Sequence, residues 1–348
     1  MNDAAAPASH RPVMLGFAGD VMLGRLVNDI VRENGWAYPW GDLPPMLQTL
    51  DAFFINLECA LTRRVEKWRN GYVRPFHFRA DPEAVEALRA GRVDFAGIAN
   101  NHIGDFGLDG LLDTIATLDR ARIAHAGAGR DLGAARAAAV VPVHGLRVAV
   151  VAFADYPDTW AAGESTPGLN FTPVSVADEH FAPVADAIAR ARHGADLVVL
   201  SMHWGPNMRE HPPEAFRHFA HRVIDAGVTI FWGHSAHILQ GIEFRNHGVI
   251  LYDTGDFIDD YAVDPELRND LGALFVVRAL PHAVAELSLV PVHIDHMRVN
   301  RATGADRTWV VRRMEVLCGE FGSHVEEHAD GSVRVLPAAH VLARTAME

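Results

Sequence analysis

The stretch Phe231–Glu243, FWGHSAHILQGIE, decides how the rest of the chain is interpreted. The stretch contains the end of an apolar run, VTIFW (228–232), which Gly233 follows, and two histidines then come three residues apart, His234 and His237. Two interpretations are open at this point. The histidines belong either to a loop that packs by chance or to a metal site at the carboxyl end of a buried strand, because imidazole is a frequent metal ligand.

Apolar runs of strand length alternate with amphipathic stretches of helical length along most of the chain. Predicted strands span 13–19, 52–58, 93–100, 147–153, 196–203, 228–234, 248–255 and 272–280, and predicted helices span 81–91, 107–121, 176–194 and 212–227. Several strands are continuously apolar, which is typical of strands covered on both faces. We therefore expect one layered α/β domain, with antiparallel pairing added after about residue 255, where helices no longer separate the strands.

Composition fits an ordinary globular protein and excludes several partners. The 348 residues are 49% hydrophobic and carry a formal charge of −13, which disfavours binding to nucleic acid or to an anionic membrane surface. The two cysteines, Cys59 and Cys318, do not form a disulfide framework, and no apolar segment is long enough to span a membrane. We expect a cytoplasmic protein whose residues 1–12 are a disordered lead-in.

Polar residues with metal-binding chemistry follow six of the predicted strands. Ligands of open α/β sheets bind beyond the carboxyl ends of the strands, so these residues are expected to meet. Each of these residues, taken alone, is also explained as a turn former or a buried polar residue. It is improbable that six strand ends would all carry metal-binding groups by chance. Carboxylate, amide and imidazole groups together suit Mn, Fe or Zn. The residues are Asp20, Asn56, Glu58, Asn100, Asn101, His102, Asp105, His203, His234, His237, Asp253 and Asp256.

The ordered set of motifs resembles a known family. GDVMLGR, NLECALT, ANNHIGDFG, HWGPN, GHSAHILQGIE and YDTGDFIDDY resemble the CapA family of capsule or poly-γ-glutamate synthesis proteins, which is similar to calcineurin-like metallophosphoesterases. The resemblance implies a four-layer α/β/β/α sandwich with two metals at one end. It implies metal ligands at Asp20, Glu58, Asn101, His203, His234 and His237, and a leaving-group acid at His102.

Several positions depart from the metallophosphoesterase pattern. Met22 stands where an Asp-x-His motif has its histidine, and Glu58 stands where a bridging aspartate is usual. The final pair is spaced HSAH in place of HxH. A late motif that reads GNF in many CapA relatives is GDF here, which adds Asp256. We predict that Asp256 supplies the missing ligand, so that one or two divalent ions are bound.

A two-metal arrangement follows as a hypothesis. Asp20, His237 and Asp256 would hold one ion, Asn101, His203 and His234 the other, and Glu58 would lie between the two. His102 would act as general acid, with Asp105 orienting its ring, although Asp105 is equally explained as a cap for the following helix. Residues expected at the mouth, with a solvated surface role as the alternative, are Arg25, Asn56, Trp204 and Asn207.

These features predict a metal-dependent hydrolase that cleaves a phosphoester with a metal-activated water. The substrate would be an anionic small molecule or polymer. The alternative is a non-catalytic or transferase-type accessory protein of poly-γ-glutamate or capsule synthesis, which the missing ligand at Met22 favours. We expect the family-like domain to span 13–299 and a less regular C-terminal extension, 300–348, to pack on it.

Overall fold

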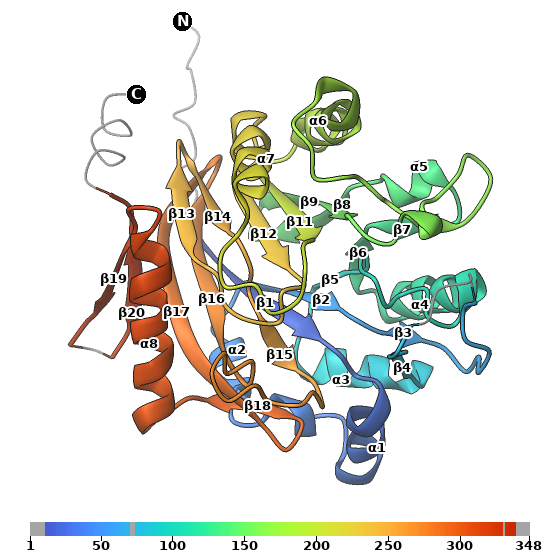
Figure 1. Ribbon diagram of the computed structural model, residues 1–348, viewed down its shortest axis with the longest axis horizontal. Coiled ribbons are helices and arrows are strands. Elements are labelled where there is room, and N and C mark those ends of the chain that lie inside the picture. The colour runs from blue at the N-terminus through green and yellow to red at the C-terminus, as the bar shows by residue number, and fades with distance from the viewer. Residues whose placement is uncertain (1–10, 70–73, 330, 339–348) are drawn as a thin grey trace, which may run out of the picture.

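Two β-sheets packed face to face form the centre of the protein (Figure 1). The computed structural model describes residues 11–69, 74–329 and 331–338. In the larger sheet the order is β19 (His324–Glu327), β20 (Val333–Leu336), β17 (Ala283–Asp295), β16 (Leu271–Leu280), β1 (Val13–Val21), β2 (Ala52–Leu57), β5 (Phe95–Gly97) and β6 (Ala124–Ala126), with β15 (Asp256–Ile258) paired to β1 and β18 (Arg298–Arg301) paired to β17. In the smaller sheet the order is β13 (Ile242–Arg245), β14 (Gly248–Leu251), β12 (Ile230–His234), β11 (Leu197–His203), β9 (Leu146–Ala154) and β8 (Ala139–Val143). Two short pairs complete the strands, β3 (Ala60–Leu61) with β4 (Arg79–Ala80) and β7 (Ala128–Gly129) with β10 (Gly168–Leu169).

Helices cover the outer faces of both sheets. The helices α6 (Asp178–Arg192) and α7 (Glu214–Asp225) pack on the smaller sheet through a separate hydrophobic cluster. On the outer side of the larger sheet lie η1 (Tyr38–Trp40), α2 (Pro44–Leu47), η2 (Pro82–Ala84) and α3 (Val85–Ala90), with α1 (Arg25–Asn34) beside them. The remaining helical segments are α4 (Gly107–Ala121), α5 (Leu132–Ala135), η3 (Asp158–Trp160) and α8 (Gly304–Gly319). The layers are therefore helix, sheet, sheet and helix, as the four-layer prediction requires.

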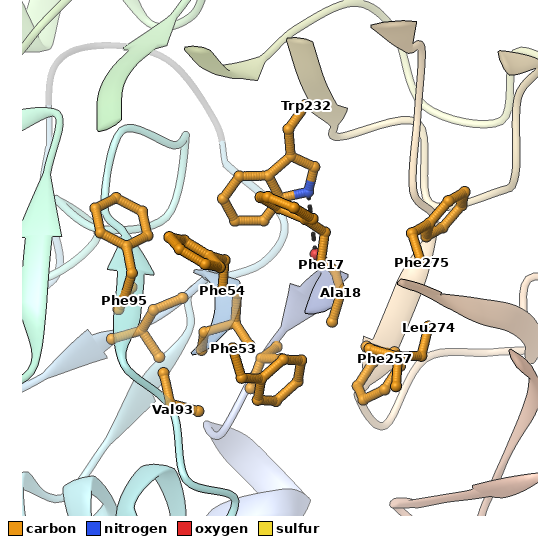
Figure 2. Packing of buried hydrophobic residues seen from close by; sticks show 14 of the residues in the cluster. Phe17, Ala18, Phe53, Phe54, Val93, Phe95, Trp232, Phe257, Leu274 and Phe275 are labelled. Carbon is orange, nitrogen blue, oxygen red and sulfur yellow. Dashed lines mark hydrogen bonds between the residues drawn. The ribbon is translucent and has the colours of Figure 1, made fainter. Parts of the chain in front are cut away.

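Aromatic side chains fill the space between the two sheets. Figure 2 shows Phe17, Phe54 and Phe95 of the larger sheet gathered around Trp232 of β12. The rings of Phe17 and Trp232 are 5.5 Å apart, and the Trp232 indole donates a hydrogen bond of 3.1 Å to the carbonyl of Ala18. Because successive strand residues face opposite sides, Phe53 points to the other face of its sheet. These contacts fix the end of β1 beside the end of β12.

Parallel pairing brings several strand ends together. Strands β1, β2, β5 and β6 are mutually parallel in one sheet, as are β9, β11, β12 and β14 in the other. In the larger sheet Asp20 is in register with both Asn56 and Asp256, and in the smaller sheet His203 is in register with His234. The predicted ligands thus meet at one rim of the sandwich.

All eight predicted strands and all four predicted helices occur, with changes at their ends. The strand predicted at 93–100 is shortened to β5, and the one at 248–255 ends at Leu251 because a turn begins at Asp253. The expectation of a less regular segment after residue 300 is wrong for its described part, which contains α8 and the β19–β20 hairpin. Ten of the twelve lead-in residues, 1–10, lie outside the described residues. Among the described helices, none combines the length and the apolar character that a membrane span needs.

Candidate metal centre

The first cluster of possible metal ligands joins the two sheets. Asp20 from β1, His203 from β11 and His234 from β12 each offer a ligand atom, and these atoms lie within 4.8 Å of one another. The Nδ1 atoms of His203 and His234 are 2.9 Å apart, and His234 Nδ1 is 3.8 Å from Asp20 Oδ1. On the far side of its ring, His234 Nε2 lies 2.8 Å from the Ser201 hydroxyl, which orients the imidazole.

The second cluster shares Asp20 with the first. It consists of Asp20, His237 and Asp256, whose ligand atoms also lie within 4.8 Å of one another. His237 Nδ1 is 2.8 Å from Asp256 Oδ1 and 3.5 Å from Asp20 Oδ2. His237 has a φ of 62°, an uncommon backbone conformation for a residue other than glycine. A carboxylate that belongs to both clusters is placed to bridge two ions.

Unpartnered buried atoms test whether these residues fit a metal. Buried polar groups almost always have a hydrogen-bond partner, so an exception calls for an explanation. Five of the predicted ligands have a buried oxygen or nitrogen without a hydrogen-bond partner in the described structure: Asp20 Oδ2, Glu58 Oε1, Asn101 Oδ1, His203 Nε2 and Asp256 Oδ2. Glu58 Oε1 is 3.9 Å from His203 Nε2. This donor set, rich in oxygen with added imidazole, fits a divalent cation.

Burial and neighbouring charges shift the pKa values of the residues in the centre. Burial, with neighbouring carboxylates, raises the pKa of Asp20, Glu58 and Asp256 well above the usual range. Burial also lowers the pKa of His203, and lowers that of His234 to about 3, which keeps both rings neutral and able to bind metal. Burial alone would lower the pKa of His237, but the carboxylates of Glu58 and Asp20 outweigh it and raise the value.

A histidine–carboxylate pair borders the centre. His102 Nδ1 lies 2.6 Å from Asp105 Oδ2, its ring stacks on Phe78 with 3.9 Å between centroids, and its Nε2 points toward Glu58 Oε1 at 4.0 Å. Asp105 Oδ2 also accepts a hydrogen bond of 2.7 Å from the backbone N–H of Phe78. Asp105 therefore contacts His102 and does not cap the helix α4, at whose N-terminus no side-chain cap is formed.

The mouth residues predicted from sequence have different surroundings. Asn56 lies inside the centre, where its Nδ2 donates to Asp20 Oδ1 at 2.7 Å. Arg25 forms a two-pronged ion pair with Asp260 and lies over the rings of Phe78 and Tyr261. Asn207 is exposed in a turn after β11.

Trp204 does not face the centre. It follows His203 directly, but its indole donates to the carbonyl of Tyr252 at 2.9 Å and packs on Phe231 and Phe216 within the cluster beneath α7. Consecutive residues at a strand end point to opposite faces, so the residue after a ligand points away from the metal. A substrate contact through this side chain is therefore not supported by its position.

The chain is similar to known proteins over most of its length. Residues 14–261 match the family model described as bacterial capsule synthesis protein PGA_cap. The chain belongs to the PGA_cap family. A probable polyglutamine synthesis accessory protein of Mycobacterium tuberculosis is 34% identical over 95% of this chain and 97% of its own length. The capsule biosynthesis protein CapA of Bacillus anthracis is 29% identical over 90% of this chain and 76% of its own length. Among solved structures, a 5′-nucleotidase from Candida albicans aligns with a TM-score of 0.45 at 12% identity over 88% of this chain and 58% of that one, and nothing is inferred from a likeness at this level.

Met22 is a buried core residue of this PGA_cap chain. Its side chain is fully buried, and its sulfur lies 3.0 Å from the backbone N–H of Gly24. Asp256, in contrast, belongs to one of the two ligand clusters. The cluster geometry is that expected if Asp256 supplies the ligand that the usual histidine would have given.

Sequence reasoning missed Tyr261 and the role of Asn100. The Tyr261 hydroxyl donates to Glu58 Oε2 at 2.9 Å, and its ring stands edge-on to His237 at 5.3 Å. Asn100 holds the loop before His102, because its Oδ1 accepts from the backbone N–H groups of His102 and Ile103. Tyr261 closes the quoted motif YDTGDFIDDY, which is the one sequence signal that marked its neighbourhood.

Proposed function

We propose that the protein is a metal-dependent hydrolase that cleaves a phosphoester, with one or two divalent ions of Mn, Fe or Zn as cofactor. The observation that carries this proposal is the set of five unpartnered buried ligand atoms at one rim. A protein without a metal would leave these atoms uncompensated at a cost of about 1–3 kcal/mol each. A bound divalent ion removes that cost.

Asp20 is the central ligand in the proposal. It belongs to both clusters, with His203 and His234 on one side and His237 and Asp256 on the other. Glu58 and Asn101 add further oxygen atoms. Divalent ions bound here would polarise a phosphate oxygen and lower the pKa of a water.

His102 is the proton donor to the leaving oxygen. Because its Nδ1 faces Asp105 at 2.6 Å, the proton that it exchanges is the one on Nε2, which points toward the centre. Burial lowers the pKa of His102 in the substrate-free protein, with the charge of Asp105 opposing that shift. An anionic phosphate beside the ring would raise the pKa again, so the ring becomes protonated when substrate is present.

Elemental analysis together with a hydrolysis assay tests the proposal. The full chain, purified without chelator, is expected to contain transition metal and to hydrolyse an aryl phosphodiester. His203→Ala should remove both, while His218→Ala should keep both, since His218 is an exposed histidine of α7. A protein with bound metal but no activity on phosphomonoesters or phosphodiesters would contradict the hydrolase and leave the metal centre standing.

One observation favours a second candidate function. Met22 occupies a position that is usually a ligand, and relatives of this chain are named as accessory or biosynthesis proteins of polyglutamine and capsule synthesis. The second candidate is therefore a non-catalytic or transferase-type accessory protein that uses the centre to bind an anionic small molecule or polymer. Metal-dependent binding of a glutamate oligomer without hydrolysis of any phosphoester would favour it.

A further inference from the structure

A hollow lined by arginines lies at the opposite end of the smaller sheet from the metal centre. Its volume is about 630 Å³, and Arg136, Arg147, Arg190 and His193 line it, with Glu164 as the acidic residue in its lining. Arg147 lies at the start of β9, where its backbone N–H donates to the side chain of Asp196, just before β11. Ala154 lies at the other end of β9, in register with His203 of the metal centre. Seven residues of strand separate the two positions, or roughly 23 Å.

Within the part of the chain that the structure describes, the three arginines have no acidic partner. No ion pair and no side-chain hydrogen bond to another described residue is made by Arg136, Arg147 or Arg190, and the Nε atom of Arg136 is buried without a partner. Several other arginines form ion pairs, as Arg245 does with Asp225 and Arg222 does with Asp178. In a chain of net charge −13, a group of like charges without counterions is unexpected, because their mutual repulsion costs free energy.

The shape of the hollow leaves room for a ligand. The remaining lining is mainly alanine and glycine, including Gly133, Ala149 and Ala187, so short side chains form the floor between the guanidinium groups. The guanidinium of Arg147 lies against Gly194, where any side chain would meet its Nη1 at 3.0 Å. A volume of this size is within the range of small-molecule sites, roughly 300–1,000 Å³.

We propose that this hollow is a second, non-catalytic site that binds a ligand with at least two oxyanion groups, phosphate or carboxylate. Guanidinium groups bind both kinds of oxyanion through paired N–H donors. Three arginines and the nearby His193 supply the charge for two such groups. The site uses none of the residues of the metal centre, so it does not depend on the proposed function.

Isothermal titration of the full chain with two probes, tripolyphosphate and a glutamate tripeptide, tests the site at low ionic strength. We expect about one bound probe per chain, with Arg147→Ala and Arg190→Ala each weakening binding at least tenfold. Both side chains are exposed, so neither substitution opens the core. The matched control is Arg130→Ala, which removes an exposed arginine that lies outside the hollow and is paired with Asp131.

The two probes and a further variant separate the possible outcomes. Tighter binding of tripolyphosphate identifies a phosphate ligand, and tighter binding of the peptide identifies a carboxylate ligand. The proposal is overturned if neither probe binds, or if the Arg147→Ala/Arg190→Ala double variant binds as the wild type does. It is also overturned if Asp20→Asn abolishes binding, because the probe then occupies the metal centre.

Discussion

Replacing Asp20 with asparagine should stabilise the metal-free protein while destroying its response to metal. Asn keeps the shape of the side chain and retains an oxygen for the Asn56 amide, which now donates to Asp20 Oδ1 at 2.7 Å. It removes a buried negative charge whose pKa is raised by burial and by the charges of Asp256 and Asp253. An amide nitrogen takes the place of the buried Oδ2 atom, which has no hydrogen-bond partner in the described structure and lies 3.5 Å from His237 Nδ1.

The size of the effect follows from the cost of the buried carboxylate charge of Asp20. Removing it should raise the free energy of unfolding at neutral pH by about 1–3 kcal/mol. For a chain of this length, each kcal/mol corresponds to a rise in Tm of about 2 °C. In the wild type, metal at a hundredfold excess over its Kd should add about 2.7 kcal/mol, and this increment should vanish in Asp20→Asn because both clusters lose their shared ligand.

Thermal unfolding with chelator and with added Mn²⁺ or Zn²⁺ measures both effects. Asp51→Asn is the control, because that carboxylate lies away from the centre and is paired with Arg11 and His144. It should lower stability by about 1–2 kcal/mol, because Asp51 also accepts a hydrogen bond from the Met14 backbone N–H, and it should leave the metal response intact. The reasoning is refuted if metal-free Asp20→Asn is less stable than the wild type and still responds to metal.

Three further predictions concern other residues. Met22→Leu should leave the metal content unchanged and cost less than about 1.5 kcal/mol, measured by elemental analysis and chemical unfolding, because Met22 fills a core position and only the contact with Gly24 is lost. His102→Gln should lower phosphodiester hydrolysis by about 10²–10⁴-fold without loss of metal, and an equal loss of metal would show that His102 is a ligand instead. Burial raises the pKa of Asp155 to about 6. Between pH 4 and 6 the folded state therefore keeps a proton that the unfolded state has released. The stability that this group contributes falls as the pH rises through that window. Asp155→Asn should therefore flatten the decline in the free energy of unfolding by up to about 3 kcal/mol, and an unchanged slope would contradict the assignment.

The sequence predicts the frame of the fold because strand and helix periods are local properties. The buried strands are continuous apolar runs, and the ends of parallel strands meet at one edge. The sequence alone therefore predicts that Asp20, His203 and His234 lie close together. The helix α8 shows where this reasoning stops. Its apolar residues are spread around the helix, so no amphipathic pattern marked it.

Pairings between distant segments were beyond the reach of local patterns. Arg25 meets Asp260 across 235 positions of sequence, and Tyr261 meets Glu58 across 203. Both pairings depend on how β15 docks beside β1. Strand alternation, in contrast, was available in advance and would have excluded Trp204 from the mouth.

The predicted grouping of the ligands agrees in part with the two clusters in the structure. The grouping of Asp20, His237 and Asp256 coincides with one of the two clusters. Glu58 was expected between the ions, whereas the residue that belongs to both clusters is Asp20.

Anomalous diffraction from crystals of the full chain grown with Mn²⁺ or Zn²⁺ tests the central claim most directly. We predict one or two anomalous peaks at this rim, beside His203 and His234, beside His237 and Asp256, or at both places, each next to the carboxylate of Asp20. Anomalous density elsewhere, or its absence from this rim at saturating metal, would contradict the account.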